Sequence, residues 1–182
     1  VILQGTRKIH LLRPSSASEQ TDECGGAPTV PFPRPPLIAD GLAVIVAGDT
    51  DAGFSGDQGP VAEAQFAIPQ SFAIADDGRI LVADSGNHRI RVISTDGVVA
   101  TLAGTGAPGY SGDGGPASEA RISGPKAIEV DGRGNVFFFD SGNFRIRRVD
   151  TCGIIETVAG NGKPGSEGDG GPALIASFRD VS

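Results

Sequence analysis

Three glycine-rich loops contain the residues of this sequence that are best suited to chemistry. One of them is AGTGAPGYSGDGGPASEA, residues 103–120. Its glycines are typical of a phosphate-binding loop, but the GK[ST] ending and the following helix of such a loop are absent. Its serine could be a nucleophile, yet no histidine is paired with Ser55 or Ser111, and the third loop has Glu167 at this position. A nucleophile that changes between copies argues against covalent catalysis.

Calcium is the remaining ligand to consider for these loops, because each has one central aspartate that follows a glycine. A calcium loop usually supplies several acidic ligands at alternating positions, and these loops do not. A structural turn built around the aspartate is therefore the favoured interpretation, and calcium is the alternative. No catalytic or cofactor-binding residue is predicted, and the candidate calcium ligands are Asp57, Asp113 and Asp169.

The other ionisable residues do not form a cluster in the sequence. His10 and His88, the two histidines, both fall on or beside a predicted outer strand. Glu156 is the one polar departure on the predicted inner strands, where other copies have Val44 and Ala100. It could point into a central channel, but a lone carboxylate is not a site. The sequence therefore favours a protein without catalytic activity, and an enzyme is the alternative.

A second motif, DSGNxRIR, occurs twice and has a structural explanation. Its aspartate ends a buried strand and can accept backbone N–H groups, and its asparagine suits a left-handed turn. We expect its first arginine to meet the aspartate across the hairpin. The alternative is an exposed arginine ring that binds phosphate or RNA, which the formal charge of −7 and the lack of neighbouring aromatics disfavour. The signature residues are Asp84, Asn87, Arg89, Asp140, Asn143 and Arg145.

Both motifs belong to a repeat of 56 residues, since the central loop aspartates occur at this spacing. Each unit predicts four strands. The runs LAVIV, ILVA and VFFF are apolar on both sides, as in sheets covered on both faces, whereas the fourth strand alternates with arginines. This pattern predicts an all-β protein, a β-propeller of four-stranded antiparallel blades with the first strand innermost. The expected first strands are 42–46, 98–102 and 154–158, followed by 71–75, 80–83 and 89–93 in one unit and by 127–130, 136–139 and 145–149 in the next.

The chain of 182 residues divides into segments of different composition. Residues 1–13 resemble the outer strand of a preceding partial blade, and the Pro/Ser-rich residues 14–40 predict a surface insertion or linker. Residues 41–94 and 95–150 are expected to be blades, and residues 151–182 to be the first strand and loop of a truncated one. No apolar run is long enough for a membrane span.

These motifs resemble the NHL-repeat family, in particular the long-loop repeats of secreted bacterial proteins and the NHL propeller of teneurin-type proteins. The resemblance covers residues 41–182 and implies a six-bladed ring, of which this chain supplies about half. Half a ring leaves two apolar sheet faces bare, so further blades or self-association are expected to close it.

The resemblance also implies a function. We expect a non-catalytic scaffold that binds a protein or small ligand on its blade-end loops, in an extracellular, periplasmic or cell-surface location, with no nucleic acid partner. One alternative is an enzyme similar to the amidating lyase or the gluconolactonase-like hydrolases, with metal ligands in further blades; another is an RNA-binding module. A disulfide between Cys24 and Cys152 would fit export, and two free thiols are the other possibility.

Overall fold

The computed structural model describes residues 51–179, and this part of the chain is all-β. The described residues contain nine strands and five single-turn 3-10 helices, and no α-helix. Among them, no helix has the length and apolar character needed to cross a bilayer. The expected outer strand in residues 1–13, the insertion at 14–40 and the strand at 42–46 lie outside the described residues, as do His10 and Cys24.

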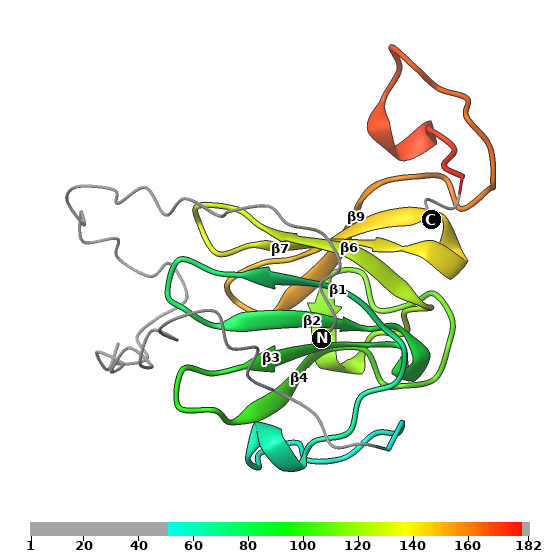
Figure 1. Ribbon diagram of the computed structural model, residues 1–182. Coiled ribbons are helices and arrows are strands. Elements are labelled where there is room, and N and C mark those ends of the chain that lie inside the picture. The colour runs from blue at the N-terminus through cyan, green and yellow to red at the C-terminus, as the bar shows by residue number, and fades with distance from the viewer. Residues whose placement is uncertain (1–50, 180–182) are drawn as a thin grey trace, which may run out of the picture. The chain divides into compact units, whose positions relative to one another are not determined.

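The first sheet has four antiparallel strands in chain order (Figure 1). Its turns form where the sequence supplies Asp and Gly: residues 76–78 connect the first two strands and residues 95–97 the last two. Both faces of the second strand are covered, as its continuous apolar run predicts. The strands are β1 (Pro69–Ile74), β2 (Ile80–Asp84), β3 (Arg89–Ile93) and β4 (Val99–Ala103).

The second sheet repeats the first at the 56-residue spacing and adds one short edge strand. Its order is β5-β9-β8-β7-β6, with every pair antiparallel. The registers of equivalent pairs agree, for example Asp84 opposite Arg89 and Asp140 opposite Arg145. The strands are β5 (Gly115–Pro116), β6 (Pro125–Val130), β7 (Val136–Asp140), β8 (Arg145–Val149) and β9 (Ile154–Ala159).

The strand order within a sheet differs from the sequence expectation. The run at 98–102 was expected to open the sheet of the strands that follow it, but it forms β4 and pairs with β3 of the preceding unit. In the same way, β9 pairs with β8. The short turn before each of these strands permits a hairpin with the strand just completed. An apolar run indicates that a strand is buried, but not which neighbour it pairs with.

The radial order is also reversed relative to the expectation. The two sheets approach each other at β1 and β6, where Ser71 Oγ accepts a hydrogen bond of 3.0 Å from the backbone N–H of Ile128, and Figure 1 shows these strands side by side. The shared core joins Leu81, Ala83 and Ile90 of the first sheet to Phe138 and Val149 of the second. In a ring of such sheets, β1 and β6 are therefore the inner strands and β4 and β9 the outer ones.

The long loops fill the spaces beside the sheets. The loop after β4 contributes Ala117, Ala120 and Ile122 to the core between the two sheets. The loop before β1 covers the opposite face of the first sheet with Val61 and Ala64. The loop after β9 projects away from the second sheet (Figure 1). Each loop contains one 3-10 turn: η1 (Val61–Glu63), η3 (Ala117–Glu119) or η5 (Ala173–Ile175).

The turn between the second and third strand of each sheet is a 3-10 turn closed by a left-handed residue. The turns are η2 (Ser85–Asn87) and η4 (Ser141–Asn143). We expected Asn87 and Asn143 to be left-handed, but the next residues, His88 at φ 52° and Phe144 at φ 51°, take this conformation. The asparagines stay in the 3-10 turn, where their side-chain amides bridge two other parts of the chain, as described below.

Candidate functional site

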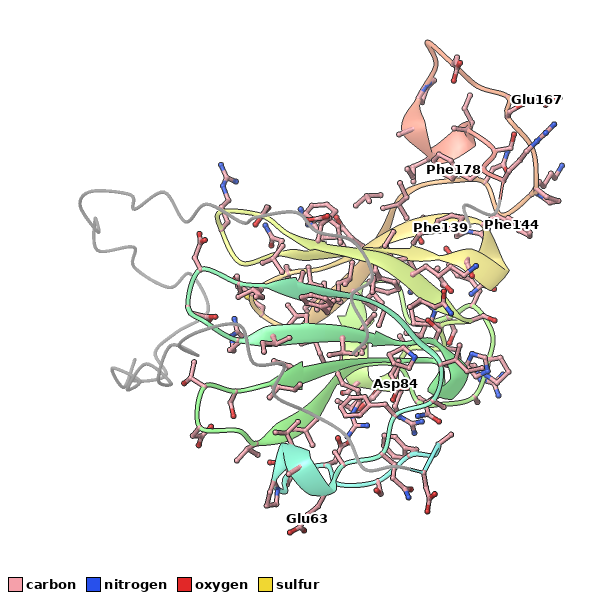
Figure 2. All side chains as sticks on the ribbon, viewed as in Figure 1. Glu63, Asp84, Phe139, Phe144, Glu167 and Phe178 are labelled. Atoms are coloured by element: carbon pink, nitrogen blue, oxygen red, sulfur yellow. The ribbon has the colours of Figure 1, made fainter. Side chains whose placement is uncertain are left out.

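The signature motif is a hairpin that fastens the preceding loop to its sheet. Asp84 lies fully buried at the end of β2 (Figure 2) and accepts hydrogen bonds of 2.8 Å from the Ala67 backbone N–H and from Asn87 Nδ2. Asn87 Nδ2 also donates to Gly53 O at 2.6 Å. Asp84 and Asn87 therefore join the start and the end of the loop to the β2–β3 hairpin.

The second sheet reproduces this arrangement. Asp140 accepts from Ser123 N–H at 2.7 Å and from Asn143 Nδ2 at 2.8 Å, and Asn143 donates to Gly109 O at 2.7 Å. The same short polar motif thus makes the same three contacts in both units. The geometry supports a structural role for the signature residues.

Arg91, a residue that the sequence analysis did not single out, is the centre of the arrangement. Its side chain is fully buried and donates to Ser55 O at 3.0 Å and Gln65 O at 3.3 Å. Its guanidinium also lies 2.8 Å from Asp57 and 3.5 Å from Asp84. A guanidinium presents five N–H donors in a fixed planar arrangement, whereas an ammonium has three, so arginine is suited to this set of acceptors.

Arg147 has the same role in the second sheet. It donates to Ser111 O at 2.9 Å and Arg121 O at 3.0 Å, and it forms ion pairs with Asp113 at 2.6 Å and Asp140 at 3.7 Å. The sequence did contain a signal for this role. The second arginine of the RIR motif, like the first, is present in both units.

The expected contact of Arg89 and Arg145 with the aspartates is corrected by this geometry. Arg89 donates to Asn87 O at 3.1 Å and to Thr105 O of the following loop at 2.7 Å. Its guanidinium also stacks 3.6 Å from the ring centroid of Phe54. Arg145 repeats these contacts with Asn143 O, Asn161 O and the ring of Tyr110. The first arginine thus links the loop before its sheet to the loop after it.

Burial changes the proton affinity of the two signature aspartates. Desolvation raises the pKa of Asp84 above its ordinary value of 3.8, and hydrogen bonds from Asn87 and Ala67 and the charge of Arg91 only partly oppose it. Desolvation raises the pKa of Asp140 further, to about 6, against the same kind of opposition. Both carboxyl groups have a structural role, and burial makes their charged form less favourable than it would be in water.

The first two loop aspartates, Asp57 and Asp113, contact side chains of the sheets and of the neighbouring loop. Asp57 accepts from Thr101 Oγ1 at 2.7 Å besides its pairing with Arg91, and Asp113 accepts from Tyr110 Oη at 2.9 Å. Burial raises the pKa of Asp113, but hydrogen bonds from Thr157, Tyr110 and Arg147 outweigh it and leave the pKa below 3.8. Calcium at Asp57 or Asp113 would have to compete with a buried guanidinium. Asp169, the third candidate, has no ion pair with a described residue.

The remaining candidates lie apart from one another. Glu156 is on an outer strand, not beside a central channel, and pairs with Arg148 at 2.8 Å. His88 Nδ1 accepts from Gly124 N–H at 3.0 Å, and Ser111 Oγ accepts from Arg121 N–H. Within residues 51–179, no three His, Cys, Asp or Glu side chains come together as a metal site. The described residues include no free cysteine, but Cys24 lies outside them, so the Cys24–Cys152 pairing stays a prediction.

A cavity of about 140 Å³ lies at one end of the interface between the two sheets. Leu81 and Leu102 line it from the first sheet, and Gly134 and Thr151 line it from turns of the second. Pockets for small organic ligands are about 300–1,000 Å³. This cavity is smaller than that range.

Two family models match the chain. The Teneurin NHL domain matches residues 96–168, and the NHL repeat matches residues 66–93. Human teneurin-4 is 36% identical over 97 residues, which are 46% of this chain and 3% of that protein. NHL repeat-containing protein 2 of Gallus gallus is 35% identical over 95 residues, 51% of this chain and 12% of that protein.

A chloroplast protein of Arabidopsis thaliana, SUPPRESSOR OF QUENCHING 1, is 35% identical over 99 residues, 53% of this chain and 9% of that protein. The chain thus spans only a small fraction of the length of these curated relatives. A solved structure of a protein of unknown function from Bacteroides thetaiotaomicron has a TM-score of 0.51 at 28% identity, with 57% of this chain and 26% of that chain covered. The repeated sheets and these matches together show that the chain belongs to the NHL-repeat family and has the fold of β-propeller blades.

Proposed function

We propose that this chain is part of a non-catalytic NHL-repeat scaffold that binds a protein or a small ligand on the turns at its blade ends. The observation that carries the proposal is how the polar signature residues are used. Their hydrogen bonds join the loops to the sheets. This holds for Asp84, Asn87 and Arg91 and for their counterparts in the second sheet. The turns at the opposite ends of the strands contain exposed residues, among them Asp76, Asp77 and Asp96.

The same observation weighs against RNA binding. An RNA-binding module needs cationic side chains that can reach phosphates and aromatic groups that can stack on bases. Arg91 and Arg147 are fully buried, while Arg89 and Arg145 donate to loop carbonyls and stack on Phe54 and Tyr110. Those aromatic rings are therefore already covered by arginine.

An assay of metal content and turnover separates a scaffold from a lyase-type or lactonase-type propeller enzyme. Because the metal ligands of such an enzyme are expected in further blades, the assay uses the protein with those blades: it is dialysed against a chelator-free buffer, its metal content is measured by mass spectrometry, and it is then incubated with gluconolactone. We expect less than stoichiometric metal and no hydrolysis above the buffer rate. One equivalent of retained metal together with turnover would make the enzyme the better proposal.

An exported or cell-surface location is part of the proposal and depends on Cys24 and Cys152. Alkylation of the unreduced full chain, followed by intact-mass measurement, tests it. We expect no alkylated cysteine before reduction and two after reduction. Two alkylated thiols in the unreduced chain would remove this support for export.

A further inference from the structure

Asn161 and Gly162 lie at the start of the third loop of the chain, residues 160–178, which follows β9 (Figure 1). The backbone nitrogen that follows an asparagine can attack its side-chain amide, because both groups belong to the same short segment. A side chain on the following residue hinders this attack, and glycine has none. The other three asparagines are followed by larger residues, which are His88, Val136 and Phe144. Asn161 is therefore the asparagine of this sequence that is best placed to react.

The backbone N–H of Gly162 is available as the nucleophile. Within residues 51–179 it donates no hydrogen bond. The N–H groups on either side of it do: Asn161 N–H donates to Ala176 O, and Lys163 N–H donates to Asn161 Oδ1, at 2.8 Å each. The nitrogen of Gly162 can thus lose its proton without breaking a hydrogen bond of the described fold.

Arg145 places a positive charge beside this peptide unit. Its Nη2 donates to Asn161 O at 3.2 Å, and its guanidinium occupies the space in which a Cβ of Gly162 would lie. A hydrogen bond to the carbonyl oxygen draws electrons from the peptide nitrogen, and a nearby cation stabilises the anion that forms when the N–H loses its proton. Arg145 therefore favours the reactive form of the nucleophile.

The side-chain amide of Asn161 is hydrogen-bonded through both of its polar atoms. Lys163 N–H donates to Oδ1, as described above, and Nδ2 donates to Ile175 O at 2.9 Å. Negative charge develops on Oδ1 when Cγ is attacked, and a backbone N–H directed at that oxygen stabilises the charge. The loop thus supplies both a nucleophile and an oxyanion donor for the same side chain.

The same position stays accessible where a further sheet follows. Thr105 is the equivalent of Asn161 in the second loop at the 56-residue spacing, and it is exposed although the second sheet follows it. Its N–H donates to Ala120 O, as that of Asn161 donates to Ala176 O, so the backbone makes the same contact in both loops. We therefore expect water to reach Asn161 in a longer chain as well.

We propose that Asn161–Gly162 is a self-modifying site, at which Asn161 loses its side-chain amide and the loop loses a hydrogen bond. Gly162 N forms a bond to Asn161 Cγ, the Cγ–Nδ2 bond breaks, and Nδ2 leaves as ammonia with the proton that Gly162 gives up. Water then opens the succinimide ring at one of its two carbonyl groups and yields aspartate or isoaspartate. Water is the co-reactant, and no atom is oxidised or reduced. The carboxylate of the product cannot donate to Ile175 O, so this link between the start and the end of the loop is broken.

Incubation of the full chain in heavy-oxygen water at neutral pH and physiological temperature, followed by peptide mass spectrometry, tests the site. We expect Asn161 to be converted at least about tenfold faster than the other three asparagines, because it alone precedes glycine. The product should carry one heavy oxygen and include isoaspartate. Unmodified Asn161 after several weeks, or conversion no faster than at the other asparagines, would overturn the proposal.

Arg145→Gln and Arg148→Gln separate the effect of the fold from that of the dipeptide. Both remove a positive charge from β8, but Arg148 pairs with Glu156 at 2.8 Å. We expect Arg145→Gln to slow conversion about fivefold, the effect of one unit charge about 4 Å away in a water-like dielectric. Arg148→Gln should convert as the wild type does, and Arg145→Lys, which keeps the charge, should be faster than Arg145→Gln.

The wild-type chain unfolded in urea gives the same comparison without a substitution. It lacks the Arg145 contact and the Lys163 hydrogen bond, so we expect it to convert more slowly than the folded chain. Conversion at least as fast in the unfolded chain, or in Arg145→Gln, as in the folded wild type would show that the loop does not promote the reaction.

Amide hydrogen exchange in Asn161→Asp measures the structural consequence. We expect the N–H of residue 161, which donates to Ala176 O, to exchange about fivefold faster than in the wild type, the size typical of losing one hydrogen bond. The N–H of Thr105, the equivalent donor of the second loop, is the control and should be unchanged. Unchanged exchange at residue 161 would contradict the loss of the link to Ile175.

Discussion

At the residue scale, the fold depends on one buried cation in each unit. Arg91 and Arg147 are fully buried, and each meets two carboxylates and two backbone carbonyls. Their Nε atoms are buried without a hydrogen-bond partner, so each guanidinium is not completely satisfied. A buried charge is tolerated only with such partners, because removing one of them leaves the other groups uncompensated. The charge network therefore couples the loop to the sheet.

The pKa of Asp140 predicts how stability depends on pH. Its folded pKa is about 6 against an ordinary 3.8, so the folded state holds the proton more tightly than the unfolded state. The contribution of this group is complete below about pH 3.8 and is lost as pH rises through about 6. The loss is about 3 kcal/mol in the free energy of unfolding. Asp84 acts in the same direction.

Urea unfolding of the wild type and of Asp140→Asn between pH 4.5 and 7.5 measures this contribution. We expect the free energy of unfolding of the wild type to fall more steeply from pH 4.5 to 6 than that of the variant. Glu119→Gln, whose position is exposed, should keep the wild-type slope. Equal slopes for the wild type and Asp140→Asn would show that Asp140 does not titrate in this range.

At the element scale, the sequence predicts strand positions better than strand partners. The expected strands at 80–83, 89–93, 136–139 and 145–149 agree with β2, β3, β7 and β8 to within one residue. The runs at 98–102 and 154–158 are strands too, but in the preceding sheet. Periodicity reports the burial of a strand, whereas pairing depends on the turn and on long-range packing.

The candidate site could be predicted only in part for a related reason. The backbone register places Asp84 opposite Arg89, as the hairpin predicts. The side chain that reaches Asp84 belongs to Arg91, which lies on the same face of β3 two residues further along, whereas Arg89 donates to Asn87 O and Thr105 O. The position of a loop 26 to 36 residues away in the chain is not visible in a short motif.

The residue just before β1 is strained, and its replacement is informative. Ile68 has φ 48°, which is unfavourable for a β-branched side chain, and it is 67% exposed. The equivalent residue of the second unit is Gly124, with φ 56°. We expect Ile68→Gly to raise the free energy of unfolding by about 1 kcal/mol, because glycine adopts this conformation without steric cost.

The urea midpoint of Ile68→Gly, compared with that of the wild type, measures the strain. Ala67→Gly is the matched control, since Ala67 is not among the residues with positive φ. That control should lower stability by about 0.5–1 kcal/mol through backbone entropy alone. If both substitutions lower stability equally, the left-handed conformation of Ile68 carries no strain.

At the scale of the whole molecule, the described sheets leave apolar side chains uncovered. Phe72 is 40% exposed and Ile74 is 64% exposed on β1, whereas Ile128, the equivalent of Phe72 in β6, is 2% exposed against the first sheet. The comparison shows that this face of a sheet is normally covered by a neighbouring one. Exposed apolar patches of this kind promote association between molecules.

We therefore expect the isolated chain of 18.4 kDa to self-associate as its concentration rises from about 1 to 100 μM, the range in which weak contacts of this size become populated. Sedimentation velocity measures the effect. The double substitution Phe72→Ser and Ile74→Thr should shift the protein toward the monomer, because it removes the apolar side chains and keeps residues suited to a strand. Glu129→Gln, at an exposed position of β6, is the control and should sediment as the wild type does.

A wild-type chain that remains monomeric over this concentration range would show that the exposed side chains of Phe72 and Ile74 do not drive association. Equal association of the wild type and the double variant would place the contact on another surface, of which exposed Leu174 and Ile175 of the third loop are the next to test.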